Sequence, residues 1–167
     1  MKCLLCILTL LTCTLFAKEP TPLRITHATT PSQLRWGLMA RRTLAADEGL
    51  LLHYPTIKPV SLWAFNCFID FDIAFLDQEG KIIEIGFLKS YPTMMEAHPP
   101  ILTLQDVDAF SDHDPLIAFF RARALYSSHP VQYALELPSG FLQRHEIKIG
   151  DQVVWGSKDL LIIPFHN

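Results

Sequence analysis

The segment WAFNCFIDFDIAFL, residues 63–76, decides the fold, because it is the most apolar stretch of the chain outside the N-terminus. Its second half nearly alternates, with Phe71, Ile73 and Phe75 on one face of an extended chain. This period of two residues predicts a strand with one buried face. The turn residues DQEG and the apolar segment 81–87 then predict a returning strand. We therefore expect a β-hairpin around which the other elements are arranged.

Further strands are expected on both sides of this hairpin. Apolar residues alternate over 131–137, and the segments 153–155 and 160–163 flank the turn GSKD, a pattern typical of a second hairpin. Shorter apolar runs predict strands at 23–28 and 50–53. Short strands spaced in this way are typical of a sheet that closes on itself and so hides its edges.

Two or three helices are expected between the strands. Thr30 and Pro31 offer a helix start, and leucine and arginine residues then follow at helical spacing as far as Arg42. A second helix is predicted from Asp112 to Tyr126, with Pro115 at its first helical position, and a short one at 141–145. Together with six to eight strands, these helices predict an α+β fold, mostly β, with a compact barrel-like sheet.

The composition indicates an ordinary globular domain. The chain has 167 residues, of which 50% are hydrophobic and 19% are charged, so a packed core is expected. The net charge of −3 and the scattered Lys and Arg residues provide no basic surface for nucleic acid. We therefore expect no nucleic-acid partner.

The N-terminus resembles an export signal. Lys2 precedes an almost unbroken apolar run, residues 3–16, and Ala17 occupies a plausible cleavage position. The run is shorter than the roughly 20 apolar residues of a membrane-spanning helix. We expect a signal peptide at 1–17 and a periplasmic or extracellular location. An uncleaved anchor, or a lipid attached at Cys13, remains an alternative that would tether the protein to a membrane.

Removal of the leader would leave a single cysteine. Cys3, Cys6 and Cys13 lie within it, so Cys67 would remain alone and no disulfide within the chain is expected. Cys67 lies in the most apolar segment, where a thiol acts as a small hydrophobic side chain. The mature chain is expected to have a flexible lead-in and first strand at 18–30, followed by one β-rich domain at 31–165.

Three blocks of sequence together resemble domain-of-unknown-function family 192. They occur in the family's order and are WGLMAR (36–41) with Leu44 and DEGLL (47–51); then Trp63, Asn66, Asp72, Phe75 and Gly80; and finally YALELPSG (133–140) with Ile147, Gly150 and Asp151. The resemblance is interrupted by an insertion at about 90–126. It implies a compact exported domain, and no reaction, because the family has no established activity.

The chain departs from the family's pattern in its central block. Ala64-Phe65 replaces the family's Met-Lys, Cys67 replaces its Thr, and Asp70 stands where a proline is usual. The lysine of the most polar family motif is therefore absent.

Polar residues near the central hairpin suggest a binding site for a small ligand or an envelope component. In this hypothesis Trp63 provides a stacking surface, and Asn66, Asp72 and Glu136 provide hydrogen-bonding groups at one mouth of the barrel. The alternative is that Trp63 belongs to the core and Asp72 accepts bonds from backbone N–H groups. The sequence favours a binding module over an enzyme and identifies no catalytic residue.

Two other functions remain open. Asp72 and Glu136 would suit a hydrolase acting on a glycan if they formed an acid–base pair about 5–10 Å apart. The insertion would suit a protein partner if its apolar residues formed an exposed patch, or would simply pack onto the barrel; these residues are Met94, Met95, Phe110, Phe119 and Phe120. The histidines lack metal-ligand spacing, and no phosphate-binding loop is present, so neither a metal nor a cofactor is expected.

Overall fold

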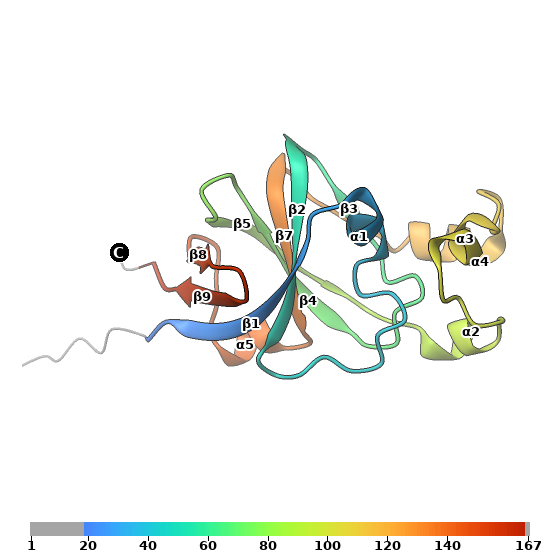
Figure 1. Cartoon of the computed structure of the whole chain (residues 1–167), viewed down its shortest axis with the longest axis horizontal. Coiled ribbons are helices and arrows are strands. Elements are labelled where there is room, and N and C mark those ends of the chain that lie inside the picture. The colour runs from blue at the N-terminus through green and yellow to red at the C-terminus, as the bar shows by residue number, and fades with distance from the viewer. Residues whose placement is uncertain (1–18, 166–167) are drawn as a thin grey trace, which may run out of the picture.

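The computed structural model describes residues 19–165 and contains a curled seven-stranded sheet, a two-stranded sheet and five short helices in this range (Figure 1). The elements along the chain are β1 (Thr21–Ala28), α1 (Pro31–Trp36), β2 (Glu48–Lys58), β3 (Ser61–Leu62), β4 (Phe71–Leu76), β5 (Ile82–Leu88), α2 (Pro92–Glu96), α3 (Leu104–Asp108), α4 (Pro115–Arg121), β6 (Leu125–Tyr126), β7 (Val131–Pro138), α5 (Phe141–Arg144), β8 (Gln152–Trp155) and β9 (Asp159–Ile163). The mostly β, α+β class predicted from the sequence is confirmed.

The large sheet has the strand order β5-β4-β7-β2-β1-β9-β8. Strands β1 and β2 run parallel, and every other pair of neighbouring strands in this sheet is antiparallel. The sheet curls so that its edges approach each other at one end. There the N–H group of Val153 donates to the carbonyl of Gly80 (2.8 Å), and that of Gly150 donates to the carbonyl of Ile82 (2.8 Å). This contact makes the sheet a half-barrel and covers part of both edges.

Strand β4 is buried on both faces, although its sequence predicted only one buried face. On one face Phe71, Ile73 and Phe75 join a core that also contains Leu52, Leu62 and Leu88. On the other face Ala74 and Leu76 join the core inside the half-barrel, which α5 also covers. The second face is buried because the curl of the sheet brings Phe141 of α5 and Leu160 of β9 into the same core.

The helices are shorter than the sequence predicted. Helix α1 ends at Trp36, not near Arg42, because Gly37 takes a positive φ of 51° and ends the helical hydrogen bonding. Helix α4 begins with Asp114 as its cap and Pro115 as its first residue, as expected, but ends at Arg121. The two helices that were not predicted, α2 and α3, have five residues each.

The insertion forms its own small core against the main body. Helices α2, α3 and α4 lie together at one end of the molecule (Figure 1). Met95, Ile101 and Phe120 are buried there with Met39 and Phe65 of the main body. Met94, Phe110 and Phe119 are partly buried against the same cluster, so of the two alternatives for the insertion, packing onto the main body describes most of these residues. Ion pairs of Arg35 with Asp108 and of Arg42 with Glu96 reinforce the contact.

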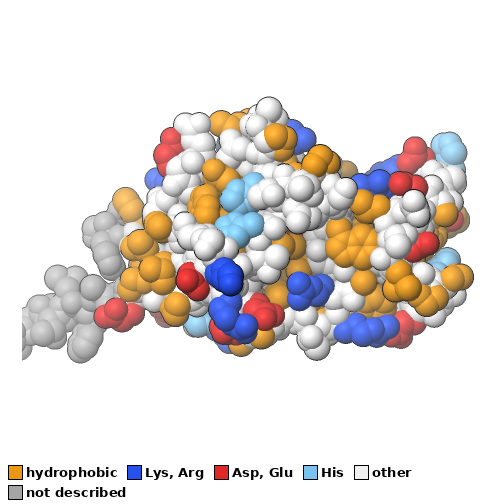
Figure 2. All heavy atoms as spheres, viewed as in Figure 1, with side chains coloured by type: hydrophobic (Ala, Val, Ile, Leu, Met, Phe, Trp, Pro, Cys, Tyr) orange, Lys and Arg blue, Asp and Glu red, His pale blue; other side chains and the backbone are white. Residues whose placement is uncertain are grey.

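The C-terminal hairpin, at the opposite end of the molecule, exposes several large apolar side chains. Val154 and Leu161 face each other across β8 and β9, and both are exposed together with Ile163 and Phe165. Figure 2 shows apolar side chains gathered at this end. The predicted signal peptide and the cysteines within it lie outside the described residues. In the part of the chain that is described, no helix is long and apolar enough to span a membrane.

Candidate functional site

Trp63 is a core residue of the insertion interface. Its ring stacks on Phe65 with a centroid distance of 5.1 Å and an interplanar angle of 27°. It is partly buried against the cluster that contains Met95 and Phe120. The indole therefore packs against a core cluster and stays partly exposed.

Asn66 connects the loop after β3 to the insertion. Its side-chain amide donates to the carbonyl of Ile101 (3.0 Å), and its own backbone carbonyl accepts from Ala40 N–H (2.6 Å). The residue is buried and has a positive φ of 56°, a conformation that asparagine tolerates better than most residues. Asn66 thus fixes the backbone that leads into Arg41.

Asp72 is a capping residue for α5. Its carboxylate accepts from the N–H groups of Gly140 (3.1 Å) and Leu142 (2.9 Å), at the start of the helix. A carboxylate at this position satisfies N–H groups that have no partner within the helix. The second part of the alternative interpretation, backbone satisfaction by Asp72, therefore also describes the structure.

Asp72 and Glu136 lie on opposite faces of the sheet. In the antiparallel pair β4–β7, Asp72 is opposite Leu137, whereas Glu136 is opposite Ile73. Directly opposed residues share a face, and neighbours along a strand alternate. Glu136 therefore shares a face with Ile73, on the side of the core that contains Phe71 and Phe75, which we call the outer core. Asp72 shares a face with Leu137, on the side of the core inside the half-barrel. This arrangement does not form the acid–base pair of the hydrolase hypothesis, and the four predicted residues do not share one cleft.

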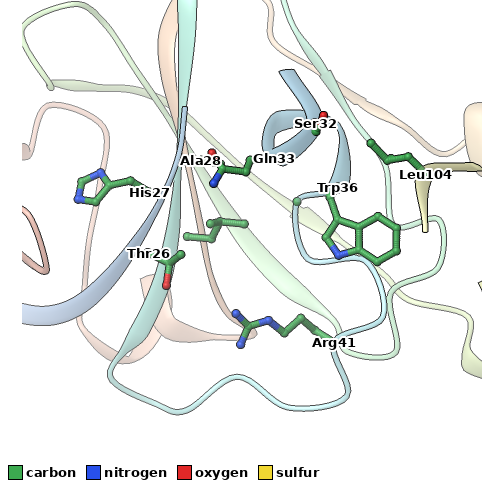
Figure 3. A pocket seen from close by; sticks show the side chains of 10 residues that line it. Thr26, His27, Ala28, Ser32, Gln33, Trp36, Arg41 and Leu104 are labelled. Atoms are coloured by element: carbon green, nitrogen blue, oxygen red, sulfur yellow. The ribbon is translucent and has the colours of Figure 1, made fainter. Parts of the chain in front are cut away.

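A different pocket, of about 430 Å³, lies between α1 and the sheet (Figure 3). Its lining residues come from β1, α1, the loop after α1, β2 and α3; they are Thr26, His27, Ala28, Ser32, Gln33, Trp36, Gly37, Arg41, Leu50 and Leu104. Leu104 belongs to the insertion, so the insertion completes one wall. The volume is within the usual range for small-molecule sites.

Arg41 and Trp36 extend toward this pocket from its rim. Figure 3 shows the Arg41 guanidinium reaching across the lower side, while the indole nitrogen of Trp36 lies on the side of its ring nearest Arg41. Among residues 19–165, neither the guanidinium nor the indole N–H has a hydrogen-bond or ion-pair partner. In contrast, Arg35 and Arg42 on the same segment both form ion pairs. The pocket therefore has two unused donors, one of them charged.

Glu136 lies next to the pocket, at Gly37. A Cβ atom on Gly37 would be 3.5 Å from Glu136 Oε2 and 3.6 Å from Oε1. The Glu136 side chain is 3% exposed, and its Oε2 atom is buried with no hydrogen-bond partner in the described chain. This burial raises the pKa of Glu136 to about 8. At neutral pH the carboxyl group is therefore mostly protonated.

The surroundings of Glu136 are apolar. Cys67 and Tyr54 are both buried in the outer core. Burial raises the pKa of each of these two groups, and the charge of Glu136 adds a smaller contribution in the same direction. Neither the Tyr54 phenol nor the Cys67 thiol can carry the positive charge that would stabilise an ionised Glu136.

His27 contributes to the pocket lining, but its ring nitrogens face elsewhere. Its Nδ1 atom is 2.8 Å from His53 Nε2, and its Nε2 atom is 2.9 Å from the carbonyl of Gly156. In Figure 3 the ring points away from Trp36 and Arg41. Burial, and then the neighbouring His27, lower the pKa of His53. Within residues 19–165 no cluster of three or more His, Cys, Asp or Glu residues could hold a metal ion.

The sequence offered weak signals for this pocket. Trp36, Gly37 and Arg41 all belong to the first block that resembles the family, but an expected continuous helix concealed the break at Gly37. Glu136 was among the hydrogen-bonding residues proposed from the sequence, but only the structure shows that its Oε2 atom is buried without a partner in the described residues. The sequence suggested Trp63 and not Trp36 as the aromatic residue of the site. The pocket that Trp36 lines is completed by Leu104 of the insertion, whose position the sequence does not give.

Comparisons with known proteins support the same fold. The model of the family DUF192, described as Uncharacterized ACR, matches residues 14–155. No curated protein matches the chain. A solved structure from Sinorhizobium meliloti 1021, described as a candidate transcription regulator, is 28% identical, with a TM-score of 0.55 and coverage of 78% of this chain and 79% of the other.

A second solved structure has no assigned function. It is a protein from Novosphingobium aromaticivorans DSM 12444, with 22% identity and a TM-score of 0.57, covering 80% of this chain and 75% of the other. At this level of identity the similarity concerns the fold alone.

Proposed function

Because the chain belongs to the uncharacterised family DUF192, which supplies no reaction, we propose from its pocket that it is an exported domain that binds a small ligand with an anionic group. The single observation behind this proposal is the unpaired Arg41 guanidinium at the rim of the 430 Å³ pocket beside α1. A guanidinium recognises carboxylate and phosphate groups through parallel hydrogen bonds.

Other groups around Arg41 fit an anionic ligand. The indole N–H of Trp36 and the hydroxyl of Thr26 are donors lining the same pocket. The apolar side chains of Leu50 and Leu104 would contact the rest of the ligand. A few polar groups in a mostly apolar cavity are the usual composition of a small-molecule site.

The position of Arg41 is set by the backbone and not by an ion pair. Its carbonyl accepts from Phe68 N–H (3.1 Å), and the preceding residue, Ala40, donates to Asn66 (2.6 Å). These bonds hold the loop on both sides of the arginine. Ligand binding would therefore order the Arg41 side chain and leave the loop backbone as it is.

The binding proposal is tested with small anions on residues 19–167. The melting temperature is measured with and without a panel of carboxylates, phosphate and phosphate monoesters. At least one is expected to raise the melting temperature of the wild type and to lose this effect in Arg41→Gln. The control is Arg121→Gln, which removes an exposed arginine paired with Asp112 at 2.9 Å, far along the chain on α4. An equal response in both variants, or no response in the wild type, overturns the proposal.

Export is a separate part of the proposal and rests on residues 1–17. A fusion of residues 1–20 to a reporter enzyme that is active only outside the cytoplasm is expected to be active in a bacterial host. Mass spectrometry of the exported full chain is then expected to show Lys18 as the first residue. A silent reporter contradicts export, whereas a retained leader or a mass increase at Cys13 indicates membrane tethering.

A further inference from the structure

We propose that the ligand of this pocket is a small zwitterion of the amino-acid type, whose acid group binds Arg41 and whose ammonium group reaches Glu136 beside Gly37. This inference rests on the binding function proposed above and specifies its ligand class. It comes from the presence of two groups that can carry opposite charges, both unpaired, at one pocket.

The strand register places Glu136 next to two residues that line the pocket, Leu50 and Gly37. Glu136 is directly opposite Leu50 in the β2–β7 pair, so the two side chains share a face of the sheet. Leu50 lines the pocket, and so does Gly37, which lies over the Glu136 carboxyl group. A Cβ atom at position 37 would be in van der Waals contact with both carboxyl oxygens, so glycine leaves this side of the carboxyl group free of side-chain atoms.

The carboxyl group is costly to bury without a partner. A buried polar atom that forms no hydrogen bond costs roughly 1–3 kcal/mol relative to a satisfied one. Glu136 Oε2 is such an atom within residues 19–165. A structural acid in this fold has its partners, as Asp72 has in Gly140 and Leu142. The missing partner of Glu136 therefore points to a ligand donor.

An ammonium group fits the vacant side of Glu136 better than a neutral donor does. It supplies both hydrogen bonds and the positive charge that the apolar surroundings lack. Binding would lower the pKa of Glu136 from about 8, so the carboxyl group would ionise and release its proton to solvent. The ammonium group remains protonated, and no bond other than the carboxyl O–H is broken.

The same pocket disfavours ligands with a single charge. A simple amine would satisfy Glu136 but would meet the unpaired Arg41, and a simple carboxylate would satisfy Arg41 but leave Glu136 without a partner. A volume of about 430 Å³ accommodates a molecule with both groups and a short apolar side chain. Selectivity for the zwitterion follows from unpaired groups on both sides.

The test uses calorimetry on residues 19–167 at pH 7. It compares the affinity for an amino acid with the affinities for two matched probes, one without the amino group and one without the carboxyl group. The twenty standard L-amino acids are screened first. For a hydrophobic one that binds, such as L-leucine, the matched probes are 4-methylpentanoate, which lacks the amino group, and 3-methylbutylamine, which lacks the carboxyl group. The amino acid is expected to bind roughly tenfold or more tightly than either half, because each half leaves one group unpaired. Its binding is expected to release close to one proton in a pH-stat.

The variant Glu136→Gln isolates the ammonium contact, because glutamine has the same shape and no charge. This variant is expected to bind 4-methylpentanoate as the wild type does, to lose the preference for L-leucine and to release no proton. The ¹³Cδ resonance of Glu136 in the wild type provides an independent readout and is expected to move to its ionised position on binding.

Two negative results have different meanings. If 4-methylpentanoate binds as tightly as L-leucine and no proton is released, the zwitterion inference fails while the anion site at Arg41 stands. If no amino acid, carboxylate or phosphate binds at all, the proposed binding function fails with it.

Discussion

Glu136 Oε2 lies 3.5 Å from the position that a Cβ atom would occupy on Gly37, so the residue that ends α1 is next to the one buried carboxyl oxygen without a partner in residues 19–165. Two features of the sequence that are far apart thus meet at one point. The first is a glycine inside an apparent helix, and the second is an acidic residue inside an apolar strand.

Gly37→Ala is expected to destabilise the protein by roughly 1–3 kcal/mol, because φ at this position is positive and an L side chain there is strained. The free energy of unfolding in urea measures the effect. Gly156→Ala is the control, since Gly156 has no positive φ and its Cβ would meet only Asp159 O at 4.0 Å. Equal losses in the two variants would contradict the assigned backbone conformation.

Glu136→Gln is expected to change the pH dependence of stability. The pKa of Glu136 is raised from 4.5 to about 8 on folding, because the buried carboxyl group favours its neutral form. Its contribution to the free energy of unfolding is therefore fully present below pH 4.5 and is lost as the pH rises toward 8. Within this window the wild type should lose about 1.4 kcal/mol per pH unit from this group. The glutamine variant should therefore become more stable relative to the wild type from pH 5 to pH 8. Parallel unfolding curves would rule out a buried, unpaired carboxyl.

Asp72→Ala is expected to cost about 1–2 kcal/mol of stability, because it removes the acceptor for two N–H groups at the start of α5. It should leave ligand responses unchanged, since Asp72 faces away from the pocket beside α1. Asp159→Ala, at an exposed position on β9, is the control for the loss of a carboxylate. A lost ligand response in Asp72→Ala, with stability preserved, would return this residue to the binding site.

Phe120→Ala is expected to cost about 3–5 kcal/mol, the usual cost of removing a fully buried aromatic ring. The reason is that Phe120 anchors the insertion to Phe65 of the main body, with ring centroids 5.5 Å apart. Leu102→Ala, at an exposed position in the same insertion, should change stability by less than about 1 kcal/mol. A small loss in Phe120→Ala would indicate that the insertion is an independent docking module.

The strands could be predicted from the sequence because their pattern is local. Alternation identified β4 and β7, and turn residues identified the hairpins β4–β5 and β8–β9. Pro115 marked the start of α4 for an equally local reason. The C-terminal end of α1 could not be predicted in the same way, since helical spacing continued beyond Gly37 and only the backbone shows its positive φ.

The site could not be predicted because it depends on register between distant strands. Asp72 and Glu136 looked equivalent in sequence. In the β4–β7 register, however, Glu136 is opposite Ile73 and not Asp72, so the two acidic residues lie on opposite faces of the sheet. The two tryptophans posed the same difficulty. Both rings are partly buried against the cluster that holds the insertion, and Trp36 also lines the pocket beside α1.

The most direct test of the binding site is the shift of backbone and indole N–H resonances of residues 19–167 during titration with the anion or amino acid that binds. The account predicts that the Trp36 indole N–H and the amides of Thr26, Gly37 and Arg41 move, while the Trp63 indole and the amide of Asp72 stay in place. Shifts centred on Trp63, Asn66 and Asp72, with Trp36 unchanged, would contradict it.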